Sequence, residues 1–273
     1  AELIFDEHVL EAYKDEGLIG HENKIGHENK KLHLRGATMP IRNLFKDIKK
    51  YARTSYPVLI TGDTGLGKEM VASLLHHFSH NKTGPFLTQN CAGLDSGILE
   101  SELFGHVKGS FTGAVANAEG LLAAVGNGTL FLDEVGETTL STQARLLRPL
   151  DGEDFMPVGG TKPKSFEGRM IFATNRNLKQ MLSEKTLRED FYHRIAILEI
   201  KVPSLGERRA DIPLLAKHFL EEHDKKMGKM GEELFDKGPS LGERRADIPL
   251  LAKHFLKEHD QKMGKMGEEL FDQ

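Results

Sequence analysis

A glycine-rich segment from residue 62 to residue 69, Gly-Asp-Thr-Gly-Leu-Gly-Lys-Glu, has the composition of a site for phosphate groups. Its spacing, G-x-x-x-x-G-K, is that of a phosphate-binding loop, with Glu69 where Ser or Thr is usual. Glycines keep bulky side chains away, so backbone N–H groups can converge on phosphate oxygens at the start of a helix. Lys68 would then reach the β- and γ-phosphates of a nucleotide, and Glu69 leaves any metal contact to Thr64 or to water.

The context of this segment favours phosphate binding over a glycine-rich turn without a ligand. An apolar run precedes it and a segment of helical period follows it, as the motif requires. The residues predicted to bind the nucleotide are Gly62, Asp63, Thr64, Gly65, Leu66, Gly67, Lys68 and Glu69.

Two carboxylates follow a second apolar run, Gly128-Thr-Leu-Phe-Leu132. Ligands of open α/β sheets bind at the carboxyl ends of strands, which is where Asp133 and Glu134 would lie. Asp133 could hold a hydrated Mg²⁺ ion, and Glu134 could polarise the water that attacks the terminal phosphate. An isolated Asp-Glu pair is commonly a helix cap or a solvated edge, but the phosphate-binding motif upstream favours catalysis.

Three further polar side chains could act on a phosphate. Asn175 follows another apolar run, and its neutral amide can orient water or sense a γ-phosphate; taken alone it would indicate a turn. Arg188 and Arg194 flank an aromatic pair, and a guanidinium at a neighbouring subunit's nucleotide can raise the rate by about 10³–10⁵. Weak surface ion pairs are the alternative for both arginines.

The elements that must position these groups alternate along the chain from about residue 32 to residue 202. Strands joined by crossover helices predict an α/β fold, a mainly parallel sheet covered by helices on both faces. The apolar residues Met70, Val71, Leu74, Leu75 and Phe78 share one face of an expected helix. The expected strands are 58–61, 86–88, 129–132, 170–173 and 195–202.

The bulk composition is that of a soluble globular protein. Of 273 residues, 38% are hydrophobic and 29% are charged, and the formal net charge of −4 gives no overall attraction to nucleic acid. The single cysteine, Cys91, excludes an intrachain disulfide framework and fits a reducing cytosol. No apolar run is long enough to span a bilayer, so we expect a cytoplasmic protein with no membrane partner.

Changes in sequence texture predict three regions. Residues 1–30 form a polar extension or linker in which the hexapeptide Ile-Gly-His-Glu-Asn-Lys occurs twice, and residues 31–202 form the α/β core. Residues 203–273 are expected to form a helical, lid-like segment that contains a near-exact duplication of 203–236 as 239–272. Whether this duplication is an evolutionary event or a feature of the recorded sequence stays open.

The core resembles the AAA+ domain of bacterial enhancer-binding proteins, the activators of sigma-54 RNA polymerase. The segment Glu102-Leu-Phe-Gly-His106 precedes a loop similar to the family's GAFTGA loop, with Ser110 in place of the first alanine. Glycines would let this loop fold and extend, while Phe111 and Thr112 present an apolar and hydrogen-bonding tip to a partner. The residues predicted to bind that partner are Gly109, Ser110, Phe111, Thr112, Gly113 and Ala114.

The resemblance, over about residues 32–220, implies an ATPase that uses ATP and Mg²⁺ and works as a ring of six or seven subunits. It implies that Asn90 is the switch residue that restrains the catalytic glutamate, and that Asn175 is the γ-phosphate sensor called sensor I. Arg188 and Arg194 resemble trans-acting arginine fingers. The implied partner is the sigma-54 RNA polymerase holoenzyme, with promoter DNA engaged only indirectly, because no helix-turn-helix is evident.

Three departures from the family pattern leave an alternative open. Val107 and Ala123 stand where the family usually has glutamates, and the segment that normally brings the sensor II arginine is absent. The phosphate-binding and loop motifs nevertheless favour an ATP-driven remodeller of the sigma-54 holoenzyme. The alternative is a nucleotide-binding regulatory or partner-binding module with weak or no turnover. A different AAA+ remodeller is a weaker third hypothesis, since such machines carry other pore loops.

Overall fold

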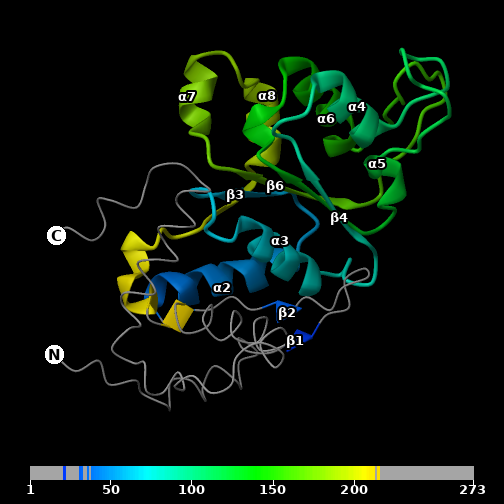
Figure 1. Ribbon diagram of the computed structural model, residues 1–273. Helices are drawn as coiled ribbons and strands as arrows, with labels where there is room; N and C mark the ends of the chain where they lie inside the picture. The colour runs from blue at the N-terminus through cyan, green and yellow to red at the C-terminus, as the bar shows by residue number, and fades with distance from the viewer. Residues whose placement is uncertain (1–20, 23–30, 33–35, 37, 213, 216–273) are drawn as a thin grey trace, which may run out of the picture. The chain divides into compact units, whose positions relative to one another are not determined.

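The computed structural model describes residues 21–22, 31–32, 36, 38–212 and 214–215 (Figure 1). The chain forms two compact units, one from Asn43–Val202 with Gly20–Leu34, the other from Arg35–Arg42 with the two ends of the chain. The proposed helical lid and the duplicated segment lie almost wholly outside the described residues. Two-residue strands pair in antiparallel fashion, β1 (His21–Glu22) in the proposed N-terminal linker with β2 (Lys31–Leu32) at the start of the proposed core.

Five parallel strands form the sheet of the larger unit, in the order β4-β5-β6-β3-β7. The strand order differs from the sequence order because crossover connections bring β3 between β6 and β7, a topology that parallel pairing requires. β5 and β6 are buried along almost their whole length, which explains their continuous apolar sequences. The strands are β3 (Val58–Thr61), β4 (Phe86–Asn90), β5 (Thr129–Asp133), β6 (Arg169–Thr174) and β7 (Leu198–Lys201).

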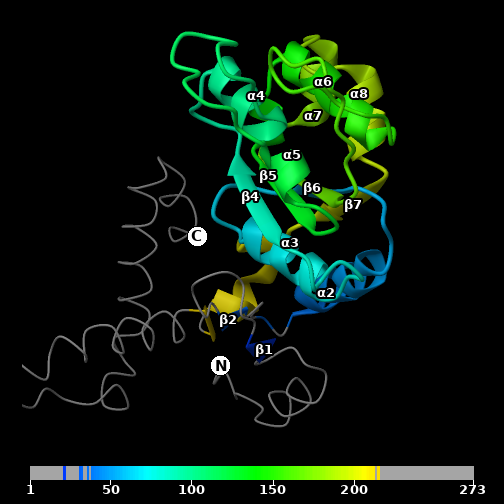
Figure 2. The ribbon, with the colours of Figure 1, turned by 90° about the vertical axis from the view of Figure 1, so that its right-hand side faces the viewer.

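Helices cover both faces of this sheet, as predicted. Figures 1 and 2 show α3 (Lys68–His77) on one side and α4 (Ser96–Phe104), α6 (Leu140–Leu150) and α8 (Glu189–Ile195) on the other. Among the helices that the structure describes, none combines the length and the apolar character that a bilayer crossing requires. The structure also describes the helices α2 (Met39–Ala52), α5 (Leu121–Ala124) and α7 (Leu178–Ser183) and the 3₁₀ turns η1 (Val135–Glu137) and η2 (Gly206–Asp211).

The predicted strand 195–202 is wrong at its start. Ile195 is the last residue of α8, and the strand β7 begins only at Leu198. The apolar residues of this stretch serve two elements, since Ile195 is buried in the helical layer and Ile200 in the sheet. Helix and strand residues of one apolar run cannot be separated by composition alone.

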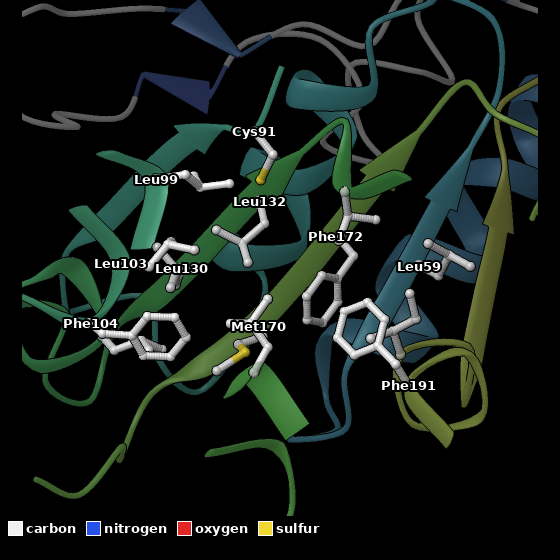
Figure 3. Close-up of a cluster of buried hydrophobic side chains, with 14 of the residues drawn as sticks. Leu59, Cys91, Leu99, Leu103, Phe104, Leu130, Leu132, Met170, Phe172 and Phe191 are labelled. Carbon is white, nitrogen blue, oxygen red and sulfur yellow. The ribbon is translucent and has the colours of Figure 1, made fainter. Parts of the chain in front are cut away.

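The main core lies between the sheet and the helical layer that contains α4 and α8 (Figure 3). Leu132 and Phe172 extend from β5 and β6 into this layer, where Leu103 of α4 and Phe191 of α8 are also buried. The rings of Phe172 and Phe191 meet edge to face, with centroids 6.2 Å apart. Burying a side chain of this size stabilises the fold by about 1.5–3 kcal/mol, so the core fixes the strands whose ends form the site.

Arg169 is the largest fully buried side chain of the described residues, although it begins an apolar strand. Its guanidinium donates hydrogen bonds to the backbone carbonyls of Tyr51, Ala52 and Tyr56, at 2.8, 3.3 and 3.2 Å. Two of these carbonyls end α2, so Arg169 caps that helix from the sheet. Burial lowers the pKa of Arg169 to about 10.

Replacing Arg169 with methionine is expected to lower the free energy of unfolding by about 3 kcal/mol, because buried carbonyls lose their donor. Chemical denaturation followed by circular dichroism measures this change. The control is Arg148→Met, since the Arg148 side chain is 52% exposed, and its loss should cost less than about 0.5 kcal/mol. Equal effects of the two replacements would contradict the capping role.

Candidate functional site

The glycine-rich segment forms a loop between β3 and α3 whose backbone only glycine adopts readily. Gly65 and Gly67 have φ angles of 79° and 91°, in the left-handed region. A Cβ atom added to Gly62 would lie 3.1 Å from the carbonyl oxygen of Val202. A Cβ atom on Gly67 would meet nothing closer than 3.9 Å, so the loop is open on that side. This shape leaves space for a ligand beside the backbone.

The N-terminus of α3 is available to an anion. Gly67 precedes the helix and offers no side-chain cap to its first N–H groups. Lys68, the first helical residue, is buried and turns its ammonium group back toward the loop. Its Nζ donates to the carbonyl oxygens of Gly62 and Asp63, at 3.0 and 3.3 Å. The charge of Lys68 is therefore held where a phosphate on the loop would need it.

Asp133 and Glu134 lie at the carboxyl end of β5, as predicted. The Asp133 carboxylate accepts a hydrogen bond from the backbone N–H of Glu134 at 2.9 Å. Glu134 has φ 52° and ψ 47°, a left-handed conformation that is strained for a residue with a side chain. Such strain costs about 1–3 kcal/mol and is commonly found at functional sites. It turns the Glu134 side chain away from the path of the strand and toward the loop.

Glu134 connects the phosphate-binding loop with the end of β6. Its Oε1 lies 3.4 Å from Lys68 Nζ, and its Oε2 accepts a hydrogen bond from the backbone N–H of Asn175 at 3.1 Å. The Asn175 amide in turn donates to Thr64 Oγ1 at 2.8 Å. The structure thus brings four of the predicted residues, from three neighbouring strand ends, into one hydrogen-bonded network.

The charges of this network fit a nucleotide with a divalent cation. Desolvation raises the pKa of Asp133, and the like charges of Glu134 and Glu69 raise it further, while the Glu134 N–H and Lys68 lower it. A carboxylate in this position gains from a nearby cation, and oxygen is the ligand that Mg²⁺ prefers. No cluster of three or more metal-ligating side chains occurs among the described residues, so phosphate and water oxygens would complete the coordination.

Asn90 ends β4 beside Asp133, with which it is paired in the sheet register. Its side-chain oxygen accepts a hydrogen bond from the backbone N–H of Ala92 at 2.8 Å. The structure contains no hydrogen bond between Asn90 and Glu134, which is held by Lys68 and Asn175 instead. The switch role of Asn90 stays a prediction.

The two candidate arginines lie at the ends of α8 and contact carboxylates of their own chain. Arg188 precedes the helix and binds Asp190 with two hydrogen bonds of 3.0 and 2.7 Å. Arg194 forms an ion pair with Asp151, at the end of α6. Neither contacts Lys68, Glu134 or the loop of the same chain, and both side chains are more than 40% exposed. Their action on a neighbouring subunit stays a prediction.

The loop from Gly109 to Ala114 forms a tight turn between α4 and α5. Gly109 donates to the carbonyl of Ala114 at 2.9 Å, and both Gly109 and Gly113 have left-handed φ angles with open space around them. Phe111 and Thr112 are exposed, and the Phe111 ring rests against the His106 imidazole at 5.0 Å. Ser110 Oγ is buried without a hydrogen-bond partner. The tip of the loop, Phe111 and Thr112, is thus exposed to solvent, whereas the Ser110 hydroxyl is not.

A short backbone junction, the loop neck, holds the base of this loop; we define it as Gly105–Val107, Ala118–Gly120 and Pro157–Val158. His106 and Ala118 exchange two backbone hydrogen bonds of 3.1 and 2.9 Å, and Val158 donates to Gly105 at 2.8 Å. A Cβ atom on Gly120 would lie 2.2 Å from the Gly105 nitrogen. The two backbone segments therefore cross so closely that no larger residue fits at position 120. Figure 1 shows the two loops that form this junction projecting together.

Comparison with known proteins decides the family. Residues 34–201, more than half of the chain, match the family described as Sigma-54 interaction domain. The chain belongs to this family. The nitrogen fixation protein VnfA of Azotobacter vinelandii is 45% identical over 193 residues, which cover 71% of this chain and 37% of VnfA. The chain thus spans little more than a third of the length of this relative.

Solved structures agree with the fold. The crystal structure of NtrX from Brucella abortus in complex with ATP has a TM-score of 0.66 and 33% identity, over 81% of this chain and 46% of NtrX. The complex of NtrX with ADP has a TM-score of 0.71 and 31% identity, over 88% and 53%. The predicted resemblance and the α/β P-loop AAA+ fold of the core are confirmed.

Two ion pairs of this sigma-54 interaction domain had no prediction from the sequence. Arg176, next to Asn175, binds Glu137 of η1 through two contacts of 2.7 Å. Arg145 and Glu100 form a second partly buried ion pair. Each pair joins residues about 40 positions apart, so no local spacing indicates it.

Proposed function

We propose that this chain hydrolyses ATP with Mg²⁺ and uses the energy to remodel the sigma-54 RNA polymerase holoenzyme through the loop Gly109–Ala114. The observation that carries the proposal is the single network of Lys68, Glu134, Asn175 and Thr64 at the carboxyl edge of the sheet. A cation, a carboxylate base and a neutral amide are the groups that phosphoryl transfer to water needs. Membership of the family supports the choice of partner.

The residues of the network suggest a sequence of events. Phosphates that enter the loop would compete with Gly62 and Asp63 for the Lys68 ammonium group, which now donates to their carbonyls. Lys68 would leave Glu134 as it turns to the phosphates. The freed carboxylate could then accept a proton from the attacking water, with Asn175 orienting the water or the γ-phosphate.

Asp133 is the side chain that would hold Mg²⁺, and Thr64 offers a hydroxyl near the same phosphates. The ion would neutralise charge on the phosphate oxygens. Glu69, at the usual position of a metal-binding Ser or Thr, is an acidic neighbour of Asp133. Glu134 and Asn175 would carry out the proton transfer and the orientation of water described above.

The active assembly we propose is a ring of six or seven copies in the cytoplasm, in which Arg188 and Arg194 reach the nucleotide of the next subunit. Each arginine would exchange its carboxylate, Asp190 or Asp151, for the phosphate. Arg188 borders a surface hollow of about 760 Å³ that Lys179, Lys185 and Glu189 also line. Promoter DNA would be engaged only through the polymerase.

Replacing Thr112 with alanine tests the partner-binding role of the loop. Thr112 is exposed at the tip, so the change removes a hydroxyl and a methyl group without disturbing the core. We expect promoter opening by the sigma-54 holoenzyme to fall by about 30-fold, the loss of one hot-spot contact. ATP turnover should stay unchanged, because Thr112 makes no contact with the nucleotide site.

The matched control is Val115→Ala, because Val115 is 81% exposed, lies next to the motif and has no proposed contact. Promoter opening, followed by permanganate reactivity of the melted strands, should be near normal for this control. Normal opening by Thr112→Ala would refute the role of the loop tip.

A second candidate function, a nucleotide-dependent binding module with weak or no turnover, has one observation in its favour. Glu134 is engaged on both oxygens, by Lys68 and by Asn175, and is therefore not free to activate water in this arrangement. Steady-state phosphate release separates the candidates. Vigorous release by the purified chain would exclude the binding module.

A further inference from the structure

Arg145 connects three separate segments of the core from its place on α6. Its guanidinium binds the Glu100 carboxylate of α4 at 2.5 Å and donates to the backbone carbonyl of Met156 at 2.9 Å. The same group lies over the Phe104 ring, 4.2 Å from its centroid. One side chain thus joins α6 to α4 and to the loop that follows α6.

Glu100, the partner of Arg145, has further hydrogen bonds of its own. Glu100 also accepts hydrogen bonds from the hydroxyl groups of Ser141 and Thr142, in the first turn of α6, both at 3.2 Å. The side chains of Arg145 and Glu100 are only 28% and 17% exposed. Charge-assisted hydrogen bonds in such surroundings are stronger and more rigid than surface ion pairs. Arg148 of the same helix lies 3.6 Å from Glu153, which follows the helix, and both side chains are more than half exposed.

One end of this connection leads to the nucleotide site. Glu134 is followed directly by η1, and the backbone N–H of Glu137 in that turn donates to the Glu134 carbonyl at 2.9 Å. Glu137 is bound by Arg176, the neighbour of Asn175. The α6 helix then begins at Leu140. A change in the backbone at Glu134, where φ is already strained, would therefore be passed to the start of α6.

The other end leads to the loop neck. Phe104 directly precedes Gly105, and Met156 directly precedes Pro157 and Val158, so both contacts of Arg145 lie next to neck residues. Gly105 and Val158 are themselves joined by a 2.8 Å hydrogen bond. Arg145 therefore contacts residues that directly adjoin two of the three segments of the neck.

We propose that Arg145, together with Glu100, is a positioning residue that transmits changes at the nucleotide site to the loop Gly109–Ala114. α6 and the neck then move as one body when Glu134 and Asn175 respond to the γ-phosphate. This inference rests on the proposed function, because it presupposes that the loop responds to nucleotide. Contact alone does not establish coupling, so the test must measure the response of the loop itself.

The chain allows a direct measurement of loop movement. Its single cysteine, Cys91, is buried, and burial raises the pKa of the Cys91 thiol to about 12, so it should resist labelling. The replacement Val115→Cys places one exposed thiol beside the loop motif. An environment-sensitive fluorophore on this cysteine reports the change when the full chain binds an ATP transition-state analogue with Mg²⁺. ATP turnover is measured on the same samples.

We expect Arg145→Ala to abolish most of the nucleotide-dependent fluorescence change and to lower promoter opening per ATP hydrolysed by about tenfold. Turnover should stay near that of the labelled parent protein, because Arg145 does not contact the nucleotide site. Glu100→Gln should have the same effect, and Arg145→Lys, which keeps a cation for Glu100, should restore part of the response. The control Arg148→Ala should leave both signals unchanged.

Two results would overturn the proposal. A full fluorescence change in Arg145→Ala would show that the loop responds without this connection. Loss of turnover and of the cooperative unfolding transition in both Arg145→Ala and Glu100→Gln would show that the pair serves the fold alone. A third result concerns the proposed function instead. If the labelled parent binds the analogue and shows no fluorescence change, the loop does not respond to nucleotide, and the proposed function fails together with the role of Arg145.

Discussion

Replacing Glu134 with glutamine is expected to lower ATP turnover by about 10²–10⁴-fold, the usual contribution of a general base. Glutamine keeps the size of the side chain and the acceptor for the Asn175 N–H, but it cannot take a proton from water. It also removes the ion pair with Lys68, so the ammonium group is freer for phosphate. ATP affinity should therefore be equal to or greater than that of the unmodified chain.

The measurement pairs steady-state phosphate release with equilibrium binding of a fluorescent ATP analogue. The control is Glu153→Gln, the same change at a carboxylate that is 62% exposed and remote from the network. If Glu134→Gln binds ATP and still releases phosphate at the normal rate, Glu134 is not the base. If the variant loses binding instead, its role is structural.

Replacing Arg194 with alanine is expected to lower turnover by about 10³–10⁵-fold, the effect of an arginine finger supplied by a neighbour. Its exposure and its lack of contact with its own site agree with action on another subunit. The same change at Arg188, which is bound to Asp190 only two residues away, shows whether one arginine or both act. Intact binding of ATP by these variants is part of the expectation.

Mixing subunits separates action in trans from action within one chain. Arg194→Ala subunits keep an intact Glu134, and Glu134→Gln subunits keep an intact Arg194. A mixed ring therefore contains complete sites at some interfaces, and turnover should reappear although each variant alone is inactive. Mixtures that stay inactive, under conditions where the rings exchange subunits, would contradict the role of Arg194 between subunits.

The gathering of the candidate site residues at one edge of the sheet could be predicted because these residues have fixed places relative to strand ends. The phosphate-binding loop follows β3, Asp133 ends β5, and Asn175 follows β6, and parallel strands bring such positions to one edge. The periodicity of the apolar residues was sufficient for the α/β class and for α3. The start of β7 was not predictable, because α8 and β7 share one apolar stretch.

The residues that support the site could not be predicted, because their partners are distant in the chain. Arg145 lies 45 residues from Glu100, and Arg169 lies more than 110 residues from the carbonyls that it caps. A charged residue within an apolar strand indicates only that some partner exists. Which carbonyl or carboxylate it meets depends on strand order and helix packing, and neither has a local signature in the sequence.

The central claim is that the loop from Gly62 to Glu69, with Lys68 and the opposing acids, is a site for ATP and Mg²⁺. Isothermal titration of the purified, unmodified chain with ATP and Mg²⁺ tests it most directly. We predict saturable binding of one nucleotide per chain, weakened by ADP as a competitor and by removal of the metal. A folded chain with no measurable affinity for ATP in the presence of Mg²⁺ would contradict the whole account.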